Sequence, residues 1–226
     1  QPSDVAFDPT SGRLYVADLA HAAVLLPKDD GQLQLVVKEY EGTPFKGPSS
    51  LAFSKDGSLY FTDSGPLGET TLQDPKGSCY AITGPPEGQV LRPLARDCLA
   101  HPCGIAVSPD GTAVYVSEML TNRVLRFVER PRGVYHMSVF HQFSGRMGPS
   151  ALACDADGNL FVARYDLSEV SDTGVVSLLS KTGDVLREFE TVGSELSGLA
   201  ISPDGSSLLV SEASTQTVSE IPLRTQ

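Results

Sequence analysis

The 226-residue sequence contains no tryptophan, few aromatic residues (7%) and only four cysteines. It has 17 Lys and Arg residues against 28 Asp and Glu residues, which gives a formal net charge of −11. Because binding phosphates needs a cationic face, this shortage of cations argues against nucleic acid or an anionic membrane as a partner. No apolar run approaches the ~20 residues of a membrane span, so no span is predicted.

The cysteines carry little functional signal. Cys79, Cys98, Cys103 and Cys154 form no C-x-x-C pair, which argues against a zinc site. Cys98 and Cys103 are close enough in sequence to bridge, but four cysteines allow three connectivities and the sequence selects none. An N-x-S/T glycosylation site is also absent, and these features together favour a reducing, intracellular compartment. A chain that opens at Gln1 rather than Met is expected to be a processed protein or an excised piece.

What the sequence does contain is one pattern in five copies. In residues 101–127, HPCGIAVSPDGTAVYVSEMLTNRVLRF, the pair Asp110-Gly111 predicts a tight turn between two strands, and the run of Val114 to Val116 predicts a strand covered on both faces. The copies begin at Pro2, Pro48, Pro102, Pro149 and Leu196. The resulting spacings of 46 to 54 residues are close to the ~40–50 residues of one four-stranded propeller blade.

An alanine recurs at one position of every predicted inner strand, where close packing near a central axis would require a small side chain. These alanines are Ala6, Ala52, Ala106, Ala153 and Ala200. The sequence therefore predicts an all-β fold, a β-propeller of four-stranded antiparallel blades in a single domain over residues 1–226. The predicted blades cover residues 1–46, 47–100, 101–147, 148–195 and 196–226. Because the last repeat has room for only three strands, the ring is either five-bladed or six-bladed with one blade missing.

Two long connections, residues 65–77 and 165–174, are predicted to share one face with the starts of the inner strands. Long loops around a central depression are where propellers usually bind their ligands. The loops add five carboxylates against Lys76: Glu69, Asp74, Asp166, Glu169 and Asp172. We therefore expect a protein or a small neutral or cationic ligand on this face, with a merely solvated acidic rim as the alternative.

The repeat P-x-G-I-A-V-S-P-D-G-x-x-V-Y-V-S-E-x-x-x-N-R-V resembles that of the SMP-30/gluconolactonase, paraoxonase and strictosidine-synthase-like propellers, with some NHL-repeat character. LYFTDS at 59–64 and PCG at 102–104 favour the strictosidine-synthase-like branch. The resemblance implies a six-bladed ring. In lactonase members it also implies a central Ca²⁺ held by a Glu, the Asn of a P-N-G and an Asp, which are the hard oxygen ligands that this cation requires.

Position by position, this metal site does not carry over. The Asn of P-N-G is replaced by Cys103, and the Asp position falls on Ser150. In the first repeat Asp4 lies one residue out of register. We predict that the equivalent ring binds a ligand together with His101 but holds no metal, unless a carboxylate such as Asp4 rebuilds the Ca²⁺ site. The ring consists of Ser3, Ser49, Cys103, Ser150 and Ser197.

Carboxylates recur at the end of the second strand of four repeats, at Asp18, Asp63, Glu118 and Glu212. Because the position repeats, we predict that each caps its own turn through backbone N–H groups rather than serving in acid/base chemistry. Arg164 interrupts the series and is expected to pair with a neighbouring carboxylate. His101 and Cys103 could form a nucleophilic pair, but residues at i and i+2 seldom point at one another and no third orienting group is evident.

Two classes of function follow. The favoured hypothesis is a non-catalytic or divergent propeller that binds a protein or ligand, because the fold alone carries no chemistry and no catalytic residue is identified. The alternative is an enzyme of the family. It would be either a lactonase- or esterase-like hydrolase or a strictosidine-synthase-like condensing enzyme, with Glu118 as the candidate base.

Overall fold

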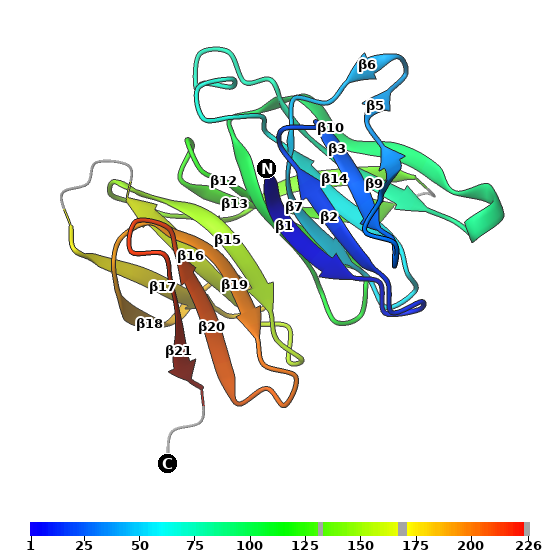
Figure 1. Ribbon diagram of the computed structural model, residues 1–226. Coiled ribbons are helices and arrows are strands. Elements are labelled where there is room, and N and C mark those ends of the chain that lie inside the picture. The colour runs from blue at the N-terminus through cyan, green and yellow to red at the C-terminus, as the bar shows by residue number, and fades with distance from the viewer. Residues whose placement is uncertain (131–132, 167–170, 224–226) are drawn as a thin grey trace.

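The computed structural model describes residues 1–130, 133–166 and 171–223, which form five antiparallel blades of a β-propeller with almost no helix (Figure 1). Blade one contains β1 (Pro2–Phe7), β2 (Leu14–Asp18), β3 (Ala23–Pro27) and β4 (Leu33–Val37). Blade two contains β7 (Pro48–Phe53), β8 (Leu59–Asp63), β9 (Gly77–Thr83) and β10 (Val90–Leu99). Blade three contains β11 (Pro102–Val107), β12 (Ala113–Glu118), β13 (Arg123–Arg130) and β14 (Val134–Gln142).

Blade four contains β15 (Met147–Cys154), β16 (Leu160–Asp166), β17 (Thr173–Leu179) and β18 (Val185–Val192). Within the described residues, blade five has three strands, β19 (Leu196–Ile201), β20 (Ser207–Glu212) and β21 (Thr217–Pro222). A small hairpin of β5 (Glu39–Tyr40) and β6 (Thr43–Pro44) links blades one and two, and a 3-10 turn spans Pro86–Gly88. No helix among the described residues is long and apolar enough to cross a membrane.

The predicted turn at Asp110-Gly111 is present. Gly111 has a φ of 72°, in the left-handed region that glycine adopts without strain. The Asp110 carboxylate accepts hydrogen bonds from Thr112 N–H (3.1 Å) and Ser108 Oγ (2.6 Å), which fixes the turn between β11 and β12. Every residue of β12 is buried, because this strand is covered on both faces by neighbouring blades. The prediction that the run from Val114 to Val116 forms a strand covered on both faces is confirmed.

The five repeated alanines occupy equivalent places in the five inner strands. Each lies directly opposite a large residue of the second strand, in the pairs Ala6–Tyr15, Ala52–Tyr60, Ala106–Tyr115, Ala153–Phe161 and Ala200–Leu209. A cross-strand pair shares one face of a sheet, so a methyl group leaves room for the bulky partner beside it. The repeat therefore reflects cross-strand packing as well as crowding at the axis.

The inner strands pack in the order β1, β7, β11, β15 and β19, and among the described residues β19 makes no comparable contact with β1. Hydrophobic clusters fill the four junctions between neighbouring blades. Backbones approach closely there: a Cβ on Gly104 would lie 2.8 Å from the Cα of Ala151 in blade four. The glycine of the Pro102-Cys103-Gly104 motif is thus required by packing between blades three and four.

Two expectations need correction. Five blades are present where the resemblance implied six. The connection predicted at 165–174 is shorter, because β16 continues to Asp166 and β17 begins at Thr173. Met147 pairs with Asp166, so the first hairpin of blade four extends beyond Pro149. Residues 167–170, including Glu169, lie outside the described part of the chain.

Candidate active site

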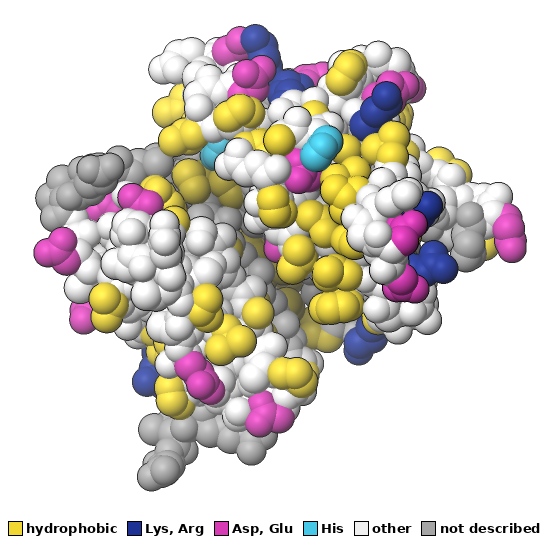
Figure 2. Space-filling model, in the orientation of Figure 1, with side chains coloured by type: hydrophobic (Ala, Val, Ile, Leu, Met, Phe, Trp, Pro, Cys, Tyr) yellow, Lys and Arg dark blue, Asp and Glu magenta, His cyan; other side chains and the backbone are white. Residues whose placement is uncertain are grey.

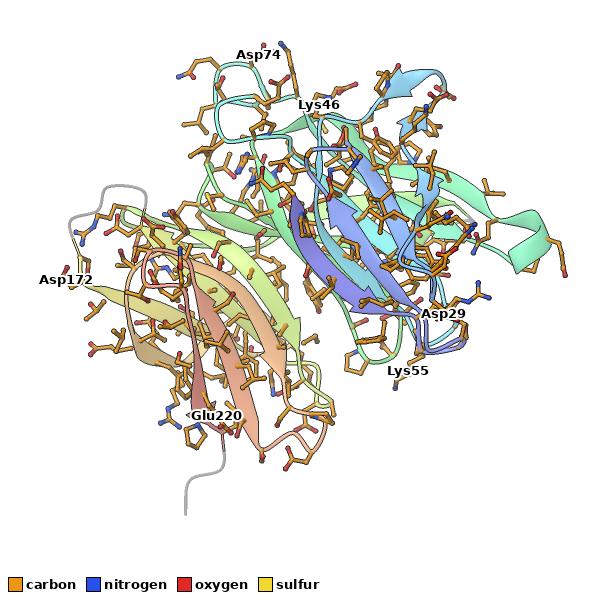
Figure 3. All side chains as sticks on the ribbon, viewed as in Figure 1. Asp29, Lys46, Lys55, Asp74, Asp172 and Glu220 are labelled. Atoms are coloured by element: carbon orange, nitrogen blue, oxygen red, sulfur yellow. The ribbon has the colours of Figure 1, made fainter. Side chains whose placement is uncertain are left out.

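One rim of the propeller carries both the inner-strand starts and the long loops. Figure 3 shows Lys46, Asp74 and Asp172 on this rim and Asp29, Lys55 and Glu220 toward the opposite one. The loop at residues 64–76 is fixed by Thr70, a fully buried residue whose hydroxyl donates to Leu99 O (3.0 Å) and accepts from Lys76 N–H (2.8 Å). The loop is thereby held against the chain that enters the inner strand of blade three.

Most hydroxyls of the predicted ligand-binding ring are used to join strands and blades. Ser3 Oγ donates to Pro48 O of blade two (2.7 Å), and Ser150 Oγ donates to Leu196 O of blade five (2.6 Å). Ser197 is exposed and lies 3.1 Å, oxygen to oxygen, from the Ser211 hydroxyl of its own blade. Ser49 is half-buried and its hydroxyl has no partner among the described residues. Ser49 is therefore the ring hydroxyl that is free to meet a ligand.

Sequence reasoning missed one member of this arrangement. Thr62, on the second strand of blade two, is fully buried and donates through Oγ1 to Cys103 O (2.7 Å), as Ser3 and Ser150 do at their junctions. The sequence signal for Thr62 is a hydroxyl residue directly before Asp63, the carboxylate that ends β8.

His101 and Cys103 are both buried at the start of β11. The Cys103 thiol points at the His101 backbone carbonyl (3.5 Å) rather than at the imidazole. Burial raises the pKa of this thiol to about 12, so it stays protonated at neutral pH and is no nucleophile. The described cysteines are all free, so Cys98 and Cys103 are not bridged. The Cys–His pair considered from the sequence is not formed.

The His101 ring is the unsatisfied group of the site. Its Nδ1 is buried and has no hydrogen-bond partner among the described residues. Burial lowers the pKa of the imidazole below its usual value, so the neutral form is favoured. A buried polar atom without a partner costs free energy, and such atoms are rare enough in native structures to call for an explanation.

The donors present do not fit the calcium ion of the lactonase members. Apart from the thiol, the ring offers hydroxyls, and two of these are committed as donors to carbonyl groups. The nearby Asp4 carboxylate accepts from Ser50 Oγ (2.7 Å) and from the N–H groups of Leu51 and Val5 (both 2.8 Å). Burial raises the pKa of Asp4 despite these bonds. Within the described residues, no three His, Cys, Asp or Glu side chains form a group that could hold a metal ion.

The repeated carboxylates bind backbone N–H groups as predicted, but the prediction that each caps its own turn is wrong for Asp63 and Glu118. Asp63 accepts from Lys46 N–H (3.1 Å) and Gly47 N–H (2.8 Å), Glu118 from Ala100 N–H (2.7 Å), and Glu212 from Glu195 N–H (3.1 Å). In each case the donor belongs to the chain that enters the inner strand of the same blade. Asp18 instead accepts from His21 N–H of its own turn (2.8 Å). Asp63, Glu118 and Glu212 are called the entry carboxylates here, and all four acids are buried. Because their oxygens are already occupied, they are unsuited to acid/base chemistry.

Blade four keeps such a carboxylate two residues further on. Asp166 is fully buried and accepts from Arg146 Nε (2.7 Å) ahead of the inner strand. Arg164 lies 3.5 Å from Glu188, the expected pairing with a neighbouring carboxylate, and its guanidinium stacks over Phe143. Blade four therefore also has a buried carboxylate at the end of its second strand, displaced by two residues from position 164 to Asp166.

Cavities on the opposite rim repeat around the molecule. One of about 700 Å³ lies between blades two and three, lined in part by Lys55, Arg92 and Asp110. Further grooves of about 510 to 590 Å³ lie at the other three junctions. Each of these cavities is lined in part by a turn between the first and second strands of a blade, and this turn is repeated in every blade. No single groove therefore stands out as a site.

The fold and this rim define a β-propeller with hydroxyl residues and one buried histidine at the starts of its inner strands. The sequence matches the family described as "SMP-30/Gluconolactonase/LRE-like region" over residues 3–214. The chain belongs to this family. A solved gluconolactonase from Xanthomonas campestris superposes with a TM-score of 0.77 at 24% identity, covering 97% of this chain and 71% of that one. That likeness shows the fold alone.

Several curated relatives are named gluconolactonase or lactonase. A gluconolactonase of Zymomonas mobilis is 36% identical over 111 residues, which cover 47% of this chain and 30% of the relative. A lactonase drp35 of Staphylococcus haemolyticus is 31% identical over 124 residues, which cover 53% of this chain and 36% of the relative. The matches thus span about a third of each relative. The expectation of a non-catalytic binding scaffold is wrong, because these relatives point to an enzyme.

Proposed function

We propose that the chain is a hydrolase of lactones or related esters, acting at the rim that carries the inner-strand starts. The observation that carries the proposal is the similarity to a gluconolactonase and to lactonases drp35 within a family that the chain matches over residues 3–214. The site supports this reaction class, because it combines a neutral imidazole at His101 with a free hydroxyl at Ser49.

The charge of the rim also suits such a substrate. The long loops contribute Glu69, Asp74 and Asp172, and Lys76 is paired with Asp74. A lactone is uncharged and is not repelled by these carboxylates, whereas the hydroxycarboxylate product is an anion that they disfavour. Binding of a neutral ligand on this face, followed by release of an anion, is consistent with the net charge of −11.

A strictosidine-synthase-like condensation finds no support in the geometry. Its candidate base, Glu118, is 1% exposed and accepts hydrogen bonds from Ala100 N–H (2.7 Å) and Thr121 Oγ1 (2.6 Å) and an ion pair from Arg123. A carboxylate that is enclosed and occupied in this way cannot reach a substrate.

The test is a hydrolysis assay on the purified 226-residue chain with D-glucono-1,5-lactone, an aliphatic γ-lactone and phenyl acetate, followed by proton release or phenol absorbance. We expect a rate proportional to protein concentration that is lost when the protein is unfolded by heat. Rates equal to spontaneous hydrolysis for all three substrates would refute the proposal.

A further inference from the structure

His101 occupies a position that the other blades fill differently. It directly precedes the first proline of the inner strand, where blade two has Gly47 and blade four has Gly148. The φ of Gly47 is 142° and that of His101 is 61°, so both residues lie on the positive side that disfavours side chains. In blade two a glycine enters the inner strand at this position, so the imidazole is not required for the entry.

The backbone of His101 therefore carries strain that a glycine at this position would avoid. The left-handed region disfavours a residue with a Cβ, and the following proline restricts the backbone further. Strain of this kind clusters at functional sites, where the side chain has a role that the fold does not supply. The His101 carbonyl accepts from Met119 N–H (3.1 Å), which holds the residue in this conformation.

The side chain itself is an independent observation. Its Nδ1 is fully buried and has no hydrogen-bond partner among the described residues. Glu118, which pairs with Pro102 on the adjacent strand, is already engaged, because its carboxylate is occupied by Ala100, Thr121 and Arg123. The imidazole is thus left without a protein partner at Nδ1, and His101 keeps 8% of its surface exposed to solvent.

We propose that His101 is the general base of the lactone hydrolysis and that it activates water without a bound metal ion. A ring nitrogen of His101 takes a proton from water as the water oxygen bonds to the carbonyl carbon. The tetrahedral intermediate collapses with cleavage of the ring C–O bond, and the imidazolium returns its proton to the leaving alkoxide. The product is a hydroxy acid, which ionises to the carboxylate and a free proton, so atoms and charge balance.

This inference rests on the proposed function and departs from the metal chemistry of the family. Cys103 stands in place of the amide oxygen ligand and Ser150 in place of the carboxylate, and the Ser150 hydroxyl already donates to a carbonyl. A cation such as Ca²⁺ needs several hard oxygen ligands. A neutral imidazole can accept a proton from the attacking water. In a metal site the metal ion would activate that water instead.

The experiment compares the unmodified chain with His101→Gly, His101→Asn and Gln216→Gly, each assayed with and without EDTA. His101→Gly restores the residue type of blade two, so we expect an unchanged or higher Tm but a fall in kcat/KM of at least about 100-fold. His101→Asn tolerates the left-handed backbone and gives a second inactive variant should glycine loosen the loop. Gln216, with a φ of 54° in blade five, is the matched control, and we expect Gln216→Gly to keep full activity.

The outcomes separate the two proposals. Activity that resists EDTA and disappears in both His101 variants, with Tm retained, supports the inference. Activity that EDTA abolishes and Ca²⁺ restores overturns the inference but leaves the hydrolase function standing. Full activity in His101→Gly likewise overturns the inference and leaves the hydrolase function standing. Absence of activity in the unmodified chain on all substrates overturns both.

Discussion

Blades three and five have nearly the same sequence pattern but very different burial. All six residues of β12 are buried, whereas β20 alternates and most of β21 is exposed. Blade three has neighbours on both sides, and the described part of blade five packs on blade four alone. Burial of a propeller strand is thus decided by the blades beside it and only secondarily by its own residues.

The opposite end of the arc, blade one, shows the same effect. Val5 and Phe7 on β1 are 54% and 67% exposed, and Figure 2 shows hydrophobic side chains over this part of the surface. Phe53, which holds the place of Phe7 in blade two, is half-buried against Tyr15 at a ring-centroid distance of 5.1 Å. The two phenylalanines differ in their neighbours, not in their position within the blade.

The largest effect should separate the interior blade from the terminal one. Phe127 is fully buried at the centre of a core cluster, so Phe127→Ala should cost about 3–5 kcal/mol of unfolding free energy. Val218 in β21 is 70% exposed, so Val218→Ala should change stability by less than about 0.5 kcal/mol. Urea unfolding of both variants measures the difference. Equal losses would mean that blade five is as tightly covered as blade three.

A smaller effect concerns the entry carboxylate of blade five. Burial opposes ionisation of Glu212, but hydrogen bonds from Ser214, Thr215 and Glu195 lower its pKa to about 2. The stability that it contributes is fully present above the unfolded-state pKa of about 4.5 and is lost as pH falls toward 2. Glu212→Gln should therefore cost on the order of 1–2 kcal/mol at pH 7.

The same comparison can be followed as a function of pH. Thermal unfolding from pH 7 to pH 2 should show the Tm of Glu212→Gln approaching that of the unmodified chain as the pH falls. Asp63 in blade two behaves oppositely, because burial raises its pKa above the usual value. A constant Tm difference at every pH would contradict the assignment of this stability to the Glu212 charge.

The smallest effect is expected at the free face of blade one. Phe7→Ser should change unfolding free energy by less than about 0.5 kcal/mol, since the ring is largely solvated already. Phe53→Ser is the matched control and should cost more, because it removes a packed ring. Differential scanning fluorimetry of both variants tests this. A large loss for Phe7→Ser would indicate that this face is covered in solution.

Much of the fold could be predicted from the sequence because the blade is a local unit that recurs. The Asp-Gly turns, the alanine register and the three-stranded last repeat all follow from short-range patterns. The displacement of the carboxylate from Arg164 to Asp166 could not be predicted, because it depends on where the first hairpin of blade four ends. A two-residue extension leaves no mark in the repeat spacing.

The site was only partly predictable for a similar reason. The ring positions and His101 were located by alignment of the repeats, but the direction of each side chain depends on the neighbouring blade. Ser3 and Ser150 turn toward carbonyls of the next inner strand, and Cys103 turns back on its own loop. Thr62 enters from a second strand, so its contact with Cys103 depends on how blades two and three pack.

The entry carboxylates have a consequence for how such proteins change over time. Each acid fastens the chain that enters its own blade, so the attachment stays inside a single repeat of about 47 residues. Duplication or deletion of a whole repeat therefore leaves every remaining attachment intact. A propeller built in this way can gain or lose blades by recombination without disturbing these attachments, and only the packing between neighbouring blades has to adapt at the join.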